Sequence, residues 1–83
     1  MTEAQLKAFP SFRNLPIYDE SANEANSITT QKNIRECSTI QQVESCLRDP
    51  GMAPLGALRV GQDGGEIVIA YFSERRMEKP FSQ

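Results

Sequence analysis

The sequence predicts an α+β fold, in which one main helix packs on a small antiparallel sheet that ends in a C-terminal β-hairpin. Two observations carry this prediction. Residues 55–60 and 67–72 are short runs rich in β-forming side chains, and a glycine-rich loop at 61–65 separates them. Apolar residues also recur at helical spacing between residues 30 and 48. With 83 residues the chain can bury a single core, so we expect one small α+β domain.

The first 27 residues are predicted to be a partly flexible N-terminal segment, followed by the domain at 28–83. Thr2 and Gln5 have the spacing of a capping box, which predicts a short helix that ends before Pro10. An extended stretch follows, and its apolar side chains could lie on the core. These side chains are Phe12, Leu15 and Ile17.

No large apolar residue occurs between residues 19 and 27. This stretch is typical of a solvated loop or linker, and we expect a domain boundary close to its end.

Two interpretations compete for the middle of the chain. A single helix from about Thr30 to Arg48 gathers Cys37, Ile40, Val43 and Leu47 on one face, and this pattern favours one long helix. Alternatively, overlapping capping boxes that begin at Ser38 and Thr39 allow a strand over 28–37 and a shorter helix after it. In both cases the helix ends at Asp49, because Pro50 and Gly51 cannot continue it.

The second strand of the hairpin is apolar on both faces, since side chains alternate along a strand. One face carries Ile67, Ile69 and Tyr71, and the other carries Val68, Ala70 and Phe72. One helix can cover only one face of a sheet. The face of Val68, Ala70 and Phe72 must then be covered by the N-terminal segment or by another molecule, so these three are the predicted partner- or ligand-binding residues.

Composition excludes several classes of function. The chain has no histidine, which removes Ser-His-Asp hydrolysis and the usual histidine metal sites. Its net charge of -2 argues against direct binding of nucleic acid. We expect no enzymatic activity, no catalytic residues, no metal and no cofactor. No apolar stretch is long enough for a membrane span, so none is expected in this fragment.

Cys37 and Cys46 are the only cysteines. On one continuous helix they would lie about 13.5 Å apart along the axis and on opposite sides, too far for a disulfide. They can pair within the chain only if the helix is broken at Ser38–Thr39. The disulfide and the strand-then-helix interpretation therefore depend on each other, and two reduced thiols in a cytosolic protein remain the alternative.

Four short motifs resemble the periplasmic sensor domains of ToxR-type membrane-anchored transcription regulators. They are Ile34–Cys37, Pro54, Gly61–Gln62 and Ile67–Tyr71, within about residues 34–72. The resemblance implies a non-enzymatic periplasmic sensor domain, cut from an inner-membrane protein and given an added Met1. It also implies a redox-responsive disulfide, a ToxS-type protein partner and a pocket for a bile salt or similar amphiphile. Only Cys37 matches a cysteine position of the family, and Cys46 does not.

A second class of function fits the same features. A small inhibitor encoded by a phage or bacterium, such as an anti-defence or immunity protein, would act in the cytoplasm by protein–protein binding. In both cases we expect a protein partner, either a co-regulator subunit or a second copy of the chain.

Overall fold

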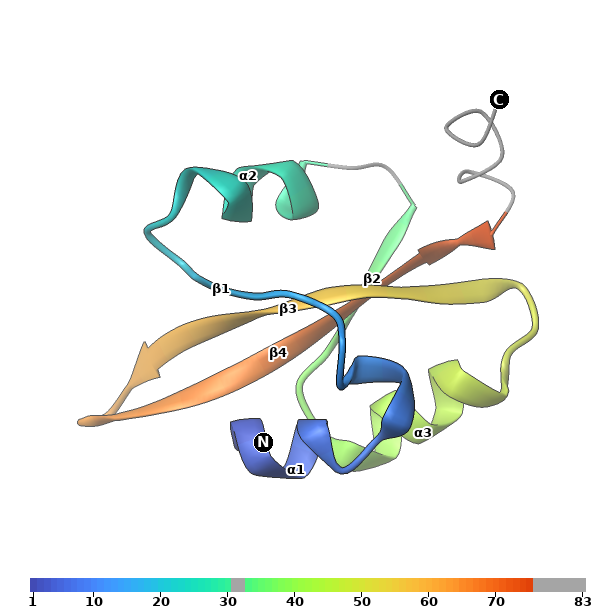
Figure 1. Ribbon diagram of the computed structural model, residues 1–83, viewed down its shortest axis with the longest axis horizontal. Helices are drawn as coiled ribbons and strands as arrows, with labels where there is room; N and C mark the ends of the chain where they lie inside the picture. Colours follow the sequence, from blue (N-terminus) through green and yellow to red (C-terminus); the bar gives the residue numbers. More distant parts are fainter. Residues whose placement is uncertain (31–32, 76–83) are drawn as a thin grey trace.

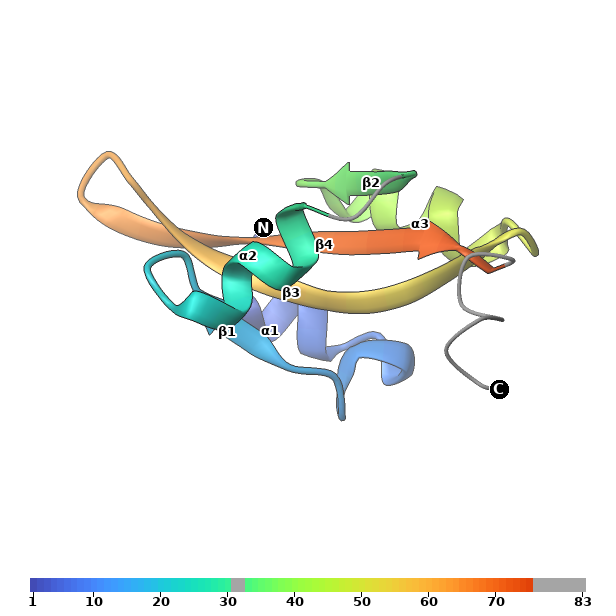
Figure 2. The same cartoon turned by 90° about the horizontal axis from the view of Figure 1, so that it is seen from above.

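The computed structural model describes residues 1–30 and 33–75 and confirms the α+β class (Figure 1). Its strands form one mixed sheet in the order β1-β3-β4-β2. The sheet places β1 and β2 at opposite edges (Figure 2). β1 pairs with β3 in parallel, whereas β3 with β4 and β2 with β4 are antiparallel. The strands are β1 (Ile17–Asp19), β2 (Ile34–Cys37), β3 (Met52–Gln62) and β4 (Gly65–Glu74).

The predicted hairpin is confirmed and is longer than the two apolar runs suggested. β3 and β4 stay paired from Met52 opposite Glu74 to Gln62 opposite Gly65. The two turn residues, Asp63 and Gly64, both have positive φ, at 48° and 81°. A two-residue turn of this kind matches the right-handed twist of the strands, and glycine adopts it without strain.

The interpretation of the middle region as a single helix is wrong. The chain instead forms β2 and then α3 (Ile40–Arg48), with Thr39 as the N-cap of α3. Backbone pairing of β2 with β4 sets Cys37 opposite Ala70, and both residues are buried. The strand begins at Ile34 and not at residue 28, while the predicted helix end at Asp49 is confirmed.

The short N-terminal helix is confirmed as α1 (Glu3–Lys7), with the capping box between Thr2 and Gln5 in place. Phe12 lies in the 3₁₀-helix η1 (Pro10–Phe12), not in an extended stretch. Both helices contribute to the core, since Leu6 and Phe12 are buried.

The solvated loop predicted over 19–27 is wrong. Asp19 belongs to β1, and α2 (Asn23–Thr29) follows, so the expected boundary near residue 27 falls inside this helix. α2 buries Ala25 and Ile28, which are three residues apart and share one side of the helix. The pattern was missed because Ala25 is small and does not stand out as an apolar anchor.

The two faces of the sheet are covered unequally. On the face we call the covered face, α1, η1 and α3 pack over Ala57, Val68, Ala70 and Phe72. On the opposite face, which we call the open face, α2 is the only helix above the sheet among the described residues (Figure 1). There Leu58 and Tyr71 are buried, and the surrounding apolar side chains are half-buried. These are Tyr18, Ile34, Leu55, Val60 and Ile69.

This arrangement corrects the predicted partner-binding residues. Val68, Ala70 and Phe72 are at most 2% exposed, because the N-terminal segment and α3 both lie on their face. The rings of Phe12 and Phe72 meet edge to face, with centroids 5.5 Å apart. The chain itself therefore supplies the cover, and the hairpin's half-buried apolar side chains Leu55, Val60 and Ile69 lie on the other side.

Candidate functional site: a buried pair of thiols

The two cysteines meet where β2 passes into α3. Cys37 is the last residue of β2, and Cys46 lies in the second half of α3. Only Ser38 and Thr39 join the strand to the helix, so α3 folds back over the end of β2. The two Sγ atoms are 3.3 Å apart, and both thiols are free.

A tight network holds this connection. The Gln42 side-chain Oε1 accepts hydrogen bonds from the backbone N–H groups of Ser38 and Thr39, at 2.8 and 3.2 Å. The Thr39 Oγ1 accepts from the Gln42 N–H at 3.2 Å, which completes the capping box. The N-terminal ammonium of Met1 adds a bond to the Ser38 carbonyl at 3.0 Å. These hydrogen bonds fix the connection between β2 and α3 that brings the two cysteines together.

The thiols are shielded from water. Cys37 has no exposed surface, and Cys46 keeps 2%. The Cys37 thiol lies 3.6 Å from the Gln42 carbonyl, to which it donates. Burial raises the pKa of Cys37 to about 12, the hydrogen bond with Cys46 adds to the rise, and the charge of Arg35 opposes it. At neutral pH, Cys37 is therefore a protonated thiol and not a nucleophilic thiolate.

A cavity of about 250 Å³ lies beside the pair. It is lined by Arg35, Glu36, Cys37, Gln42, Ser45 and Cys46. Arg35 and Cys37 are two residues apart in β2, so both side chains point to the same face of the sheet. Glu36 points to the other face, where its carboxylate accepts from the Tyr71 hydroxyl at 3.2 Å. That contact and burial raise the pKa of Tyr71 to about 12, with burial as the larger cause.

The geometry allows one kind of covalent chemistry. A disulfide requires the sulfurs to approach by only about 1.2 Å from their present separation, because the S–S bond is about 2.05 Å long. In the part of the chain that the structure describes, no group of three or more Asp, Glu, Cys or His residues could hold a metal ion. Over the same residues, no helix is long and apolar enough to cross a membrane.

The sequence predicted that Cys37 and Cys46 can meet only if the helix is interrupted between them. The interruption is there, at Ser38–Thr39. The prediction missed Arg35 and Gln42. The spacing of Arg35 from Cys37 in a strand and the capping-box position of Gln42 were the signals that could have found them.

Comparison with known proteins adds no constraint on this site. No protein-family model, no curated protein sequence and no solved structure matches the chain.

Proposed function

We propose that this chain is a non-enzymatic sensor or interaction domain of a membrane-bound transcription regulator of ToxR type, located in the periplasm. The observation that carries the proposal is the pair of buried free thiols, whose sulfurs lie 3.3 Å apart. Disulfides form and persist in oxidising compartments such as the periplasm and are rare in the cytosol.

Oxidation of the pair would strengthen the domain where α3 meets the sheet. Two thiols give up two electrons and two protons to a disulfide oxidant, and the new bond closes a short loop between Cys37 and Cys46. A loop of this length is expected to add about 2 to 3 kcal/mol to the free energy of unfolding. For a domain with a single small core this is a large share of the total stability.

The partner would bind at the open face and the adjoining edge of β2. If two copies paired antiparallel through β2 about a two-fold axis, odd-numbered residues would lie opposite odd-numbered residues and even-numbered opposite even-numbered. The two registers that pair most of the strand then set Arg35 against Arg35 or Glu36 against Glu36. Like charges directly opposite are destabilising, so we assign this edge to a different protein, a co-regulator subunit. The bile-salt pocket implied by the resemblance stays a prediction.

The proposal is tested by counting thiols in the chain expressed in the periplasm, with and without reductant. We expect no free thiol before reduction, two after it, and a melting temperature on the order of 10 °C higher in the oxidised form. A Cys46→Ala variant is the control and should show no reductant-dependent shift. Sedimentation of the oxidised chain should give a monomer.

Two results would contradict the proposal. Two free thiols after periplasmic expression would favour the alternative of a cytoplasmic inhibitor. A concentration-dependent dimer would replace the co-regulator with a second copy.

A further inference from the structure

We propose that the cavity beside Cys37 and Cys46 admits small anionic disulfides, such as oxidised glutathione, and that Arg35 positions their carboxylates for oxidation of the pair. This inference rests on the proposed function, because it presupposes that the pair is oxidised. It adds the class of oxidant, the side chain that selects it and the order in which the sulfurs react.

Arg35 is placed to act on a ligand in this cavity. It lines the cavity, it shares a face of β2 with Cys37, and its side chain is exposed. Its charge is close enough to lower the pKa of Cys37 against the effect of burial. Within residues 1–30 and 33–75, no carboxylate forms an ion pair with it, and the neighbouring Glu36 is engaged by Tyr71 on the other face. The guanidinium can therefore offer its paired N–H groups to a carboxylate.

The size of the cavity selects a small oxidant. Its volume of about 250 Å³ is suited to one half of a low-molecular-weight disulfide and not to a folded protein. Arg35, Gln42 and Ser45 are among the lining residues, so a peptide-like reagent with amide and carboxylate groups meets polar residues there. Arg35 supplies the one positive charge of the lining, opposite in sign to such a reagent.

The exposure of the two sulfurs indicates the order of the steps. Cys46 keeps a small exposed surface and Cys37 has none, so Cys46 is the sulfur that attacks the reagent first. Its thiol loses a proton to solvent, the sulfur bonds to one half of the reagent, and the other half leaves as a thiolate. Cys37 then loses its proton and attacks the Cys46 sulfur at 3.3 Å, releasing the second half. In total, one disulfide reagent is reduced to two thiols while the protein dithiol is oxidised.

The test is the rate at which the reduced chain is oxidised by three reagents of different charge. We would use oxidised glutathione, which is anionic, hydroxyethyl disulfide, which is neutral, and cystamine, which is cationic. We expect the ratio of the glutathione rate to the cystamine rate to be about three- to tenfold lower in Arg35→Gln than in the unaltered chain. Arg35→Lys should restore part of the ratio, and 0.5 M salt should reduce it in the unaltered chain.

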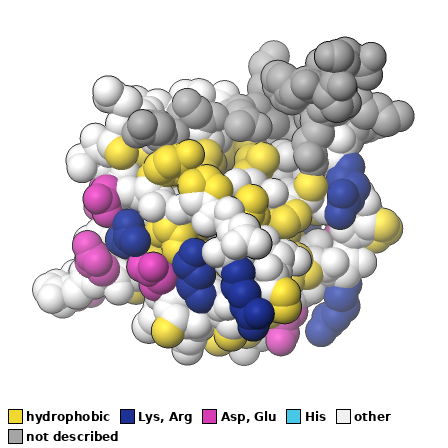
Figure 3. Space-filling view, in the orientation of Figure 1, with side chains coloured by type: hydrophobic (Ala, Val, Ile, Leu, Met, Phe, Trp, Pro, Cys, Tyr) yellow, Lys and Arg dark blue, Asp and Glu magenta, His cyan; other side chains and the backbone are white. Residues whose placement is uncertain are grey.

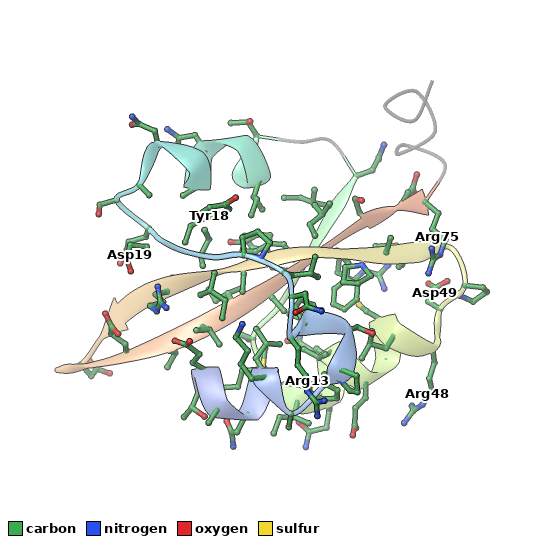
Figure 4. The ribbon with its side chains drawn as sticks, viewed as in Figure 1. Arg13, Tyr18, Asp19, Arg48, Asp49 and Arg75 are labelled. Carbon is green, nitrogen blue, oxygen red and sulfur yellow. The ribbon has the colours of Figure 1, made fainter. Side chains whose placement is uncertain are left out.

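Arg48→Gln is the matched control. Arg48 is an exposed arginine at the end of α3 and points away from the body of the molecule (Figure 4). Its replacement should leave the ratio unchanged. The melting temperature of the reduced Arg35→Gln protein, compared with that of the reduced unaltered chain, shows whether its fold is intact.

Two outcomes would overturn this inference while leaving the disulfide itself in place. One is an equal ratio of rates in the unaltered chain and in Arg35→Gln. The other is oxidation at a rate independent of reagent concentration, which would mean that opening of the fold limits access. Failure of every reagent to oxidise the chain would instead count against the proposed function.

Discussion

The two faces of the sheet differ in how completely the chain covers them, although one strand supplies apolar side chains to both. On the covered face, Val68 and Phe72 are fully buried beneath two α-helices and a 3₁₀-helix. On the open face, α2 covers only part of the surface, and Ile69 and Val60 stay half-buried. Apolar side chains reach the surface where α2 meets the sheet, and Tyr18 points from β1 toward this helix (Figures 3 and 4). The larger buried cluster thus lies on the covered face, and the apolar side chains of the hairpin that stay half-buried lie on the open face.

The difference shows why the thiol pair and the accessible apolar surface are separate features. Cys37 and Cys46 belong to the core of the covered face, where α3 is anchored. The half-buried Leu55, Val60 and Ile69 of the hairpin belong to the open face, which is supported by the shorter helix α2. A disulfide would strengthen the side that is already well packed, and the open face would be left free for a partner.

The largest expected effect compares two valines of the hairpin, one on each face. Val68→Ala should lower the free energy of unfolding by about 2 to 3 kcal/mol, because it removes buried methyl groups and leaves a cavity. Val60→Ala removes the same atoms from a half-buried site on the open face and should cost less than about 1 kcal/mol. Urea denaturation of both variants measures the difference. Equal costs would mean that the two faces are packed alike, against the structure.

A second comparison concerns two glycines of the hairpin region, Gly56, which lies against the residue before β1, and Gly64, in the turn. Gly56 follows a register shift in β3 and has φ of 152°, and a Cβ here would lie 2.9 Å from the Pro16 carbonyl oxygen. Gly56→Ala should therefore cost about 2 kcal/mol or more, from backbone strain and from separation of β1 from β3. Gly64→Ala, in the hairpin turn, meets no atom within 4 Å and should cost about 1 kcal/mol. Thermal unfolding separates the two, and a smaller loss at Gly56 than at Gly64 would contradict this account.

The parts of the fold that could be predicted were those specified by residues close together in the sequence. Glycines at 61–65 and β-forming runs on either side specified the hairpin, and Thr2 with Gln5 specified α1. The middle region could not be resolved in this way, because the same apolar spacing suits one long helix or a strand followed by a helix. Pairing of β2 with β4 decided between them, and that is a contact between distant segments.

The candidate site shows the same limit. The spacing of Cys37 and Cys46 made their pairing conditional on a broken helix, which is as far as local reasoning reaches. Which face of the sheet is covered by the chain itself could not be derived, because Val68, Ala70 and Phe72 alternate with residues that are equally apolar. Only the folded chain shows that α3 and the N-terminal segment both pack on the covered face.

The smallest expected effect concerns the helices that cover the two faces. α3, on the covered face, begins with the Thr39 capping box, whereas α2, on the open face, begins at Ala22 without a side-chain cap. Thr39→Ala should cost about 1 kcal/mol, since it removes the acceptor for the Gln42 N–H. Ala22→Ser should add up to about 0.5 kcal/mol by supplying the missing cap. Ser38→Ala is the comparison: it removes the Ser38 hydroxyl, which donates to the Gln42 Oε1 at 3.3 Å, but it leaves the Thr39 acceptor in place, and it should cost less than Thr39→Ala. If Ser38 proved the more costly loss in urea denaturation, α3 would begin one residue earlier, and the turn that brings Cys37 to Cys46 would have to be redrawn.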